Sequence, residues 1–231
     1  MHYEVKIYLI CLIINLSIKI INYMILLIDC SKGLNLILGN RKKIIQTLNK
    51  PRIKKVSEAL VAEIENLLNS ASKSYKDLTK IIVINGPGSF TGLRTGVTAA
   101  KVLALSLNIP VCGISQFDLL SLEYSKIQSN KDQKIYIHLN DHKFFFQSIL
   151  KSGKKSEISI VNFETDKPID ILGFDVISDD NKIVNSLRII SKLNQKLNLF
   201  IYRDIFSLCY KNLVNLAENK YIPNPIYVKT F

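Results

Sequence analysis

The chain has 231 residues, and its 31 lysines and arginines outnumber its 19 acidic residues to give a formal net charge of +12. Because 48% of the residues are hydrophobic, the composition excludes a disordered chain, and 9 glycines with 6 prolines are too few for collagen or linker sequence. The length suffices for one large domain or two small lobes with an ordinary core.

The first 23 residues contain a mostly apolar run, Ile7–Ile18, that is shorter than the roughly 20 residues of a membrane span. A signal peptide or an envelope anchor is an alternative, but Met1–Lys6 is weakly basic and no small-x-small cleavage site follows. From Met24 the sequence is typical of a buried first strand. We therefore expect residues 1–23 to be an extension upstream of the true start.

The four cysteines lie far apart in the sequence and form no CxxC pair; they are Cys11, Cys30, Cys112 and Cys209. A disulfide framework or a zinc knuckle is therefore not expected. Reduced cysteines fit a reducing compartment, and we expect a cytoplasmic protein without a membrane partner.

The first half of the chain alternates predicted strands and helices. Apolar runs predict strands at 24–28, 34–38, 81–84 and 110–114, and helices at 56–68, 91–107 and 117–127. This alternation is typical of βαβ units.

The second half is predicted to be more antiparallel. It has strand patterns at 134–139, 144–150 and 158–161, followed by helical patterns near 182–197 and 204–220. We predict an α/β chain of two lobes, with residues 24–118 in the first lobe and 119–231 in the second. The run Phe144–Phe146 is expected in the core rather than on a base-stacking platform.

The most informative segment is Gly86–Gly96, with the sequence GPGSFTGLRTG, between a predicted strand and a predicted helix. Its glycines allow a tight turn, the amides at a helix start can face an anion, and Ser89 or Thr91 can cap the helix. No Gly-Lys-Ser/Thr follows, so it is no Walker loop, and Thr91 replaces the third glycine of a dinucleotide fingerprint. A tight turn without a ligand is the alternative.

This segment, with Ala100-Lys101 and Ile109-Pro110 after it, closely resembles the signature of the TsaB (YeaZ) family. Three further pieces resemble the family's opening, first-helix and closing motifs: Ile28-Asp-Cys-Ser31, Ser57-Glu58-x-Leu60 and Pro225-x-Tyr227-Val228. The resemblance is strong over residues 24–120, weak over 121–231 apart from the tail, and absent before residue 24.

The resemblance implies a two-lobed actin/sugar-kinase/heat-shock-ATPase-like (RNase H-like) fold and a non-catalytic role. The chain would be a subunit of the complex that installs N6-threonylcarbamoyladenosine next to the anticodon of ANN-decoding tRNAs. The implied partners are the catalytic paralogue TsaD, which it would activate, and a TsaE-like ATPase, with tRNA contacted through the complex and a homodimer when alone. An autonomous, small kinase-like ATP-dependent enzyme of the same fold is the alternative.

No metal site is expected. TsaD-like chains carry a metal-binding His-x-x-x-His after the Ile-Pro strand, where this chain has Gln116 and Leu120. His138 and His142 share that spacing, but residues four apart on a strand are about 13 Å apart, too far to share one ion. No catalytic residue is expected either, because Ser89 lies in no Gly-x-Ser-x-Gly elbow.

Residues facing a nucleotide or phosphate are predicted after the first strand and in the glycine segment. The turn after the first predicted strand is about one residue shorter than in the family, so we expect no tightly bound cofactor. Binding of ATP in the complex with a partner is the alternative. The candidates are Asp29, Ser31, Gly86, Gly88, Ser89, Thr91, Gly92 and Arg94.

A partner interface is predicted on the first-lobe helices, because small residues leave the backbone of the second helix open to close approach. The family's homodimer and TsaD interfaces involve these helices, and packing inside the lobe is the alternative. The predicted interface residues are Leu60, Ile64, Leu93, Gly96, Val97, Ala99, Ala100 and Leu103.

The basic charge is concentrated between Cys30 and Ser57, a stretch with eight basic residues and no acid. No base-reading motif accompanies it. We interpret it mainly as solvated surface, and a supporting phosphate contact is the alternative. The basic residues are Lys32, Arg41, Lys42, Lys43, Lys50, Arg52, Lys54 and Lys55.

Overall fold

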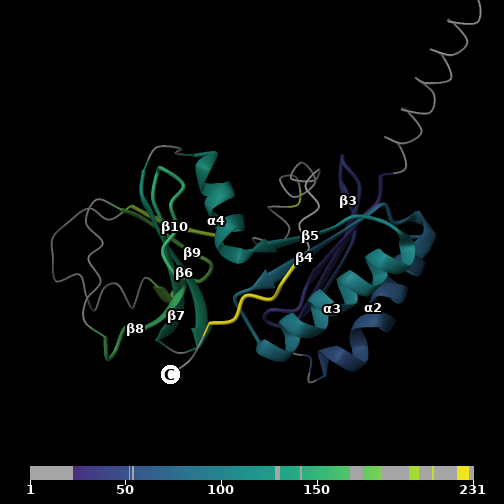
Figure 1. Cartoon of the computed structure of the whole chain (residues 1–231), viewed down its shortest axis with the longest axis horizontal. Helices are drawn as coiled ribbons and strands as arrows, with labels where there is room; N and C mark the ends of the chain where they lie inside the picture. Colours follow the sequence, from purple (N-terminus) through teal and green to yellow (C-terminus); the bar gives the residue numbers. More distant parts are fainter. Residues whose placement is uncertain are drawn as a thin grey trace, which may run out of the picture.

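Two mixed sheets with covering helices form the part of the chain that the computed structural model describes (Figure 1). The described residues are 23–51, 53, 55–127, 131–140, 142–166, 174–183, 198–202, 210 and 223–228. The expected N-terminal extension and most of the two helices predicted in the second lobe lie outside them. Among the described helices, none has the length and hydropathy of a membrane span.

The first sheet has the strand order β3-β2-β1-β4-β5. Strands β1 to β3 form an antiparallel meander, and β4 and β5 run parallel to β1. The strands are β1 (Ile25–Asp29), β2 (Leu34–Gly39), β3 (Ile44–Lys50), β4 (Lys80–Gly86) and β5 (Val111–Ser115). The helices of this lobe are α2 (Val56–Ser70), the short 3-10 helix η1 (Tyr75–Asp77) and α3 (Phe90–Leu107).

The second sheet repeats this topology. Read from its β8 edge, its order is β8-β7-β6-β9-β10, again a meander followed by two strands parallel to the first. Its strands are β6 (Gln133–Asn140), β7 (Lys143–Ile149), β8 (Ser159–Asn162), β9 (Asp175–Ser178) and β10 (Leu199–Ile201). Helix α4 (Gln116–Ser125) lies between the two sheets in the sequence, and the predicted lobe boundary at residue 118 falls within it.

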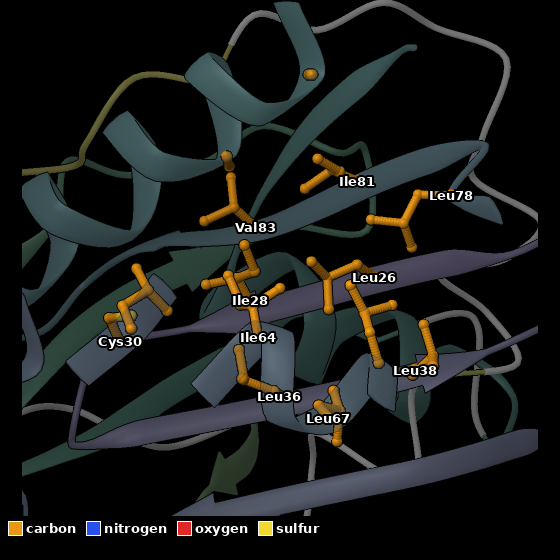
Figure 2. Close-up of a cluster of buried hydrophobic side chains, with 14 of the residues drawn as sticks. Leu26, Ile28, Cys30, Leu36, Leu38, Ile64, Leu67, Leu78, Ile81 and Val83 are labelled. Atoms are coloured by element: carbon orange, nitrogen blue, oxygen red, sulfur yellow. The ribbon is translucent and has the colours of Figure 1, made fainter. Parts of the chain in front are cut away.

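Both faces of the central strands β1, β2 and β4 of the first sheet are buried. Helices α2 and α3 cover one face, where Ile28 and Leu36 meet Ile64 of α2 in a continuous apolar cluster (Figure 2). On the other face, Ile82 packs with Leu119 of α4. Strand β1 is buried at every residue, which explains its uninterrupted apolar sequence.

Aromatic side chains fill one side of the second sheet. Tyr136 of β6 contacts the rings of Phe144, Phe146 and Phe163, with centroids 5.0–6.4 Å apart. Phe144 is fully buried and Phe145 packs on the opposite face of the sheet. The prediction that the Phe144–Phe146 run belongs to the core is confirmed.

A buried carboxylate, Asp175, joins α4 to the start of β9. It is 2% exposed and accepts hydrogen bonds from the Tyr124 hydroxyl and from the Asn198 amide at 3.0 Å, and Lys131 lies 3.4 Å away. Burial alone would raise the pKa of Asp175, but the three donors outweigh burial and hold it below the usual range. The ionised carboxylate is therefore the form that stabilises the fold.

We expect Asp175→Asn to lower the free energy of unfolding by about 2 kcal/mol at neutral pH, because the charge-assisted hydrogen bonds weaken. The folded-state pKa lies below the unfolded one, so the unfolded chain takes up the proton first as the pH falls. The deficit of the variant should be constant above pH about 4 and should vanish at lower pH.

Urea unfolding of wild type and variant across this pH range measures the difference. Glu157→Gln, at an exposed position, is the control and should change stability little at any pH. A deficit that persists unchanged in acid would contradict this role of Asp175.

Candidate functional site

The glycine segment leaves the end of β4 and immediately contacts the C-terminal segment. Gly86 has φ +138°, and a Cβ there would lie 2.9 Å from the carbonyl oxygen of Ile226. Next to this contact, the Ile226 amide donates a 2.7 Å hydrogen bond to the carbonyl of Asn85. Only glycine combines this conformation with this close approach.

The polar groups of the segment find partners within the chain. The Ser89 amide donates to the Ser31 carbonyl at 2.8 Å, and the Ser89 hydroxyl accepts from the Gly92 amide at 3.3 Å. The Gln116 side chain donates to the carbonyl of Pro87 at 2.6 Å. The prediction that Ser89 or Thr91 caps the helix is confirmed for Ser89, the N-cap of α3.

Several of the predicted phosphate-facing residues do come together. Gly88 lies against Ser31, where an added Cβ would be 2.6 Å from the serine Cβ. Asp29 accepts hydrogen bonds from the Ser31 amide at 2.8 Å and from the Asn35 side chain at 3.4 Å. Their polar groups thus stabilise the β1–β2 turn and the glycine segment, and nucleotide binding by these residues stays a prediction.

Other members of that set point elsewhere. Thr91 and Arg94 are exposed on the outer side of α3, and the Arg94 guanidinium lies 5.4 Å from the centroid of the Phe90 ring. Gly92 instead faces inward, where a Cβ would overlap the carbonyl oxygen of Cys30. The eight predicted residues therefore do not surround one common site.

The inward face of α3 rests directly on the end of β1. A Cβ at Gly96 would be 3.1 Å from the Cys30 sulfur, so both helical glycines bring the helix backbone close to one residue. Burial raises the pKa of the Cys30 thiol to about 12, with a smaller contribution from nearby Asp29, so the thiol is protonated and unreactive.

The C-terminal segment Pro223–Val228 crosses from one lobe to the other (yellow in Figure 1). Pro223 lies against Gly113 of β5, and the Tyr227 ring stacks on Phe90 with centroids 4.7 Å apart. Val228 reaches the apolar cluster of the second sheet. The motif Pro225-x-Tyr227-Val228 was noted in the sequence, but no feature of the sequence indicated that this motif contacts both lobes.

A salt bridge also connects the lobes beside the β1–β2 turn. The Lys32 ammonium lies 2.5 Å from the Asp179 carboxylate, which also accepts a 2.7 Å hydrogen bond from the His138 amide. The lysine of the β1–β2 turn is thus paired with an acid of the second lobe.

The predicted partner interface requires a correction. Six of its eight residues are buried in the chain itself because the stripe faces the sheet, and only Ala99 and Leu103 are partly exposed. The small residues permit close packing of α3 on β1, which was the alternative. The buried residues are Leu60, Ile64, Leu93, Gly96, Val97 and Ala100.

The opposite face of the same helices exposes large apolar side chains that the sequence reasoning missed. Val61 of α2 is 58% exposed, and Val102 and Leu105 of α3 are 56% and 84% exposed. The sequence did contain a sign of this exposure. These apolar residues lie outside the buried stripe of their helices, at positions where a surface helix normally carries polar residues. We call Val102 and Leu105, which are three residues apart on α3, the outer apolar face.

The two histidines of the second lobe face separate carboxylates. His138 lies 3.5 Å from Asp180, and His142 lies 3.1 Å from Glu164. Within the described ranges, no three His, Cys, Asp or Glu side chains are grouped as metal ligands. Gln116 and Leu120, which replace the histidines of TsaD-like chains, are buried structural residues.

Comparisons with known proteins give a consistent picture. A family profile described as "TsaD: tRNA N6-adenosine threonylcarbamoyltransferase" matches residues 50–134. A Bacillus subtilis "tRNA threonylcarbamoyladenosine biosynthesis protein TsaB" is 48% identical over 58 residues, 25% of each chain. The TsaB-named protein of Buchnera aphidicola subsp. Schizaphis graminum is 28% identical over 123 residues, 51% of this chain and 59% of that one. Over these segments the chain is similar to proteins named TsaB.

The solved structures agree with the predicted fold. A Pseudomonas aeruginosa protein described as similar to peptidase YeaZ has a TM-score of 0.58 and 17% identity, covering 90% of this chain and 100% of that one. Together with the repeated sheet topology, this confirms the predicted two-lobed actin/sugar-kinase/heat-shock-ATPase-like fold. The matches with the two TsaB relatives named above span 25% and 59% of those proteins.

The glycine segment supplies a direct test of this packing. We expect Gly92→Ala to destabilise the protein by about 2 kcal/mol, because overlap with the Cys30 carbonyl outweighs the gain of about 1 kcal/mol in helix propensity. Thr98→Ala, at an exposed position of the same helix, is the control and should be neutral or slightly stabilising. Urea unfolding measures both, and a Gly92→Ala protein as stable as wild type would show that α3 does not rest on Cys30.

Proposed function

We propose that this chain is a non-catalytic subunit of the complex that installs N6-threonylcarbamoyladenosine in ANN-decoding tRNAs. It would partner and activate a TsaD-like subunit in the cytoplasm, with a TsaE-like ATPase in the same assembly. A homodimer of the chain alone, and tRNA contact through the complex, belong to this proposal. The relatives named TsaB support the pathway.

One observation carries the non-catalytic part of the proposal. The positions that hold metal-binding histidines in TsaD-like chains carry Gln116, whose amide supports the glycine segment, and Leu120, which is fully buried. Neither side chain can replace an imidazole ligand. The packing also gives no support to an autonomous kinase-like enzyme, since Asp29 already accepts local hydrogen bonds.

The outer apolar face supports the partner part of the proposal. Side chains as exposed as Leu105 gain free energy when a partner covers them, whereas single exposed apolar residues scattered on a surface need no explanation. The first-lobe helices thus contribute their outward face to a TsaD-like partner, rather than the inward face that the sequence predicted. ATP would be bound in the complex and not tightly by this chain.

Depletion of this protein in its own cells should lower N6-threonylcarbamoyladenosine in bulk tRNA, as measured by mass spectrometry of nucleosides. Re-expression of the wild type should restore it, and the double variant Val102→Glu, Leu105→Glu should not, because two charges on the outer apolar face would be buried without partners.

Ser152→Glu, an exposed position in the second lobe, should restore the nucleoside like the wild type and is the matched control. An unchanged nucleoside level on depletion would contradict the proposed function. Full rescue by the folded double variant would contradict only the assignment of the partner surface.

A further inference from the structure

The structure divides the basic stretch between Cys30 and Ser57 into paired and unpaired charges. Three of its lysines face acids: Lys32 faces Asp179, Lys50 lies 2.5 Å from Glu63 and Lys55 lies 2.7 Å from Glu58. Arg52 and Lys54 lie outside the described residues. The remaining three, Arg41, Lys42 and Lys43, are consecutive, exposed, and have no carboxylate partner within the described ranges.

These three residues form the turn between β2 and β3, which we call the basic turn (residues 40–43). The Asn40 side-chain oxygen accepts from the amides of Lys42 at 2.8 Å and Lys43 at 3.0 Å, and the Asn40 amide donates to the Lys43 carbonyl at 2.9 Å. The Tyr210 hydroxyl donates to the Asn40 carbonyl at 3.1 Å. Because these hydrogen bonds hold the backbone of the turn, little backbone entropy is lost when the turn binds a ligand.

The arginine of the turn is also held in place. Its guanidinium lies over the Tyr23 ring, 4.3 Å from the centroid. Stacking on a ring leaves the N–H groups at the edge of the guanidinium free for the planar, bidentate hydrogen bonding that suits phosphate.

A buried lysine lies near Arg41 at this end of the sheet. The Lys80 side chain is 1% exposed, and its amino group has no hydrogen-bond partner among the described residues. Burial is the main reason why the pKa of Lys80 is lowered, the Cys112 thiol opposes this, and Arg41 lowers it further. The described residues supply no acid that compensates Arg41 here.

The residues around the basic turn favour a polyanionic ligand that is bound through its charges and makes no apolar contact. The exposed large apolar side chains of the described residues lie at positions 61, 90, 102, 105, 127 and 227, and none of them belongs to the turn. An amphipathic membrane surface or a typical protein interface would place apolar residues beside the charges. Nucleic-acid phosphates need only the charges.

We propose that the basic turn binds phosphates of tRNA without reading its sequence. This inference rests on the proposed function in tRNA modification, and it adds the surface through which this chain itself contacts the RNA.

The test measures the affinity of the full chain for an unmodified tRNA transcript over a series of salt concentrations. The triple variant Arg41→Gln, Lys42→Gln, Lys43→Gln keeps Asn40 and the turn backbone. We expect about tenfold weaker binding at low salt and a slope of log K against log salt that is smaller by two to three, about one for each lost phosphate contact.

The control removes three charges from exposed lysines elsewhere, by Lys76→Gln, Lys151→Gln and Lys154→Gln, and should leave the slope nearly unchanged. An equal loss in the control, or an unchanged slope in a folded basic-turn variant, would overturn the proposal. So would loss of binding to phosphatidylglycerol vesicles with tRNA affinity intact. Because affinity is measured directly, a failure here is distinguishable from an unchanged nucleoside level on depletion.

Discussion

The contact on which the first lobe depends is the close approach of α3 to the end of β1. Gly92 and Gly96 place the helix backbone against Cys30, a residue whose side chain is buried beneath them. This close approach sets the position of the first turn of α3. The first turn in turn places the Ser89 amide so that it donates a hydrogen bond to the Ser31 carbonyl. A larger side chain at either glycine would lift the helix and release the turn that precedes it.

The glycine segment consequently joins parts of the chain that are distant in sequence. It lies between the β1–β2 turn on one side and the C-terminal segment 223–228 on the other, and the latter continues into the second lobe (Figure 1). The Lys32–Asp179 salt bridge ties the same region to the second sheet. The glycine segment therefore contributes to the cohesion of the two lobes.

Much of the first lobe could be predicted because local sequence determines it. The apolar runs of β1, β2 and β4 are buried as expected, and Ser89 was identified as a possible cap from its place before the helix. Strand β3 was not predicted, because it is an edge strand whose exposed positions carry Gln46, Thr47 and Asn49. Strands β9 and β10 are short, and β9 pairs with β6 while β10 pairs with β9, so their place in the sheet depends on long-range pairing rather than on their own pattern.

The predicted partner interface was wrong where the answer depended on long-range contacts. An apolar helical stripe with small residues looks the same whether it packs on its own sheet or on a partner, and here Gly96 and Ala100 pack on the sheet. The pairing of Lys32 with Asp179 joins residues 147 positions apart and leaves no local signal. Charge counting alone therefore could not separate the paired lysines from the exposed basic turn.

The central claim, that the glycine segment is held by its own chain, can be tested directly by amide hydrogen exchange of the full protein followed by NMR. We predict slow exchange without any ligand for the amides of Ser89, Gly92, Leu93 and Ile226, which all donate hydrogen bonds within the chain, and no further slowing when ATP is added. Rapid exchange of these amides that becomes slow on addition of ATP would contradict it, because the segment would then be an open anion site that a ligand completes.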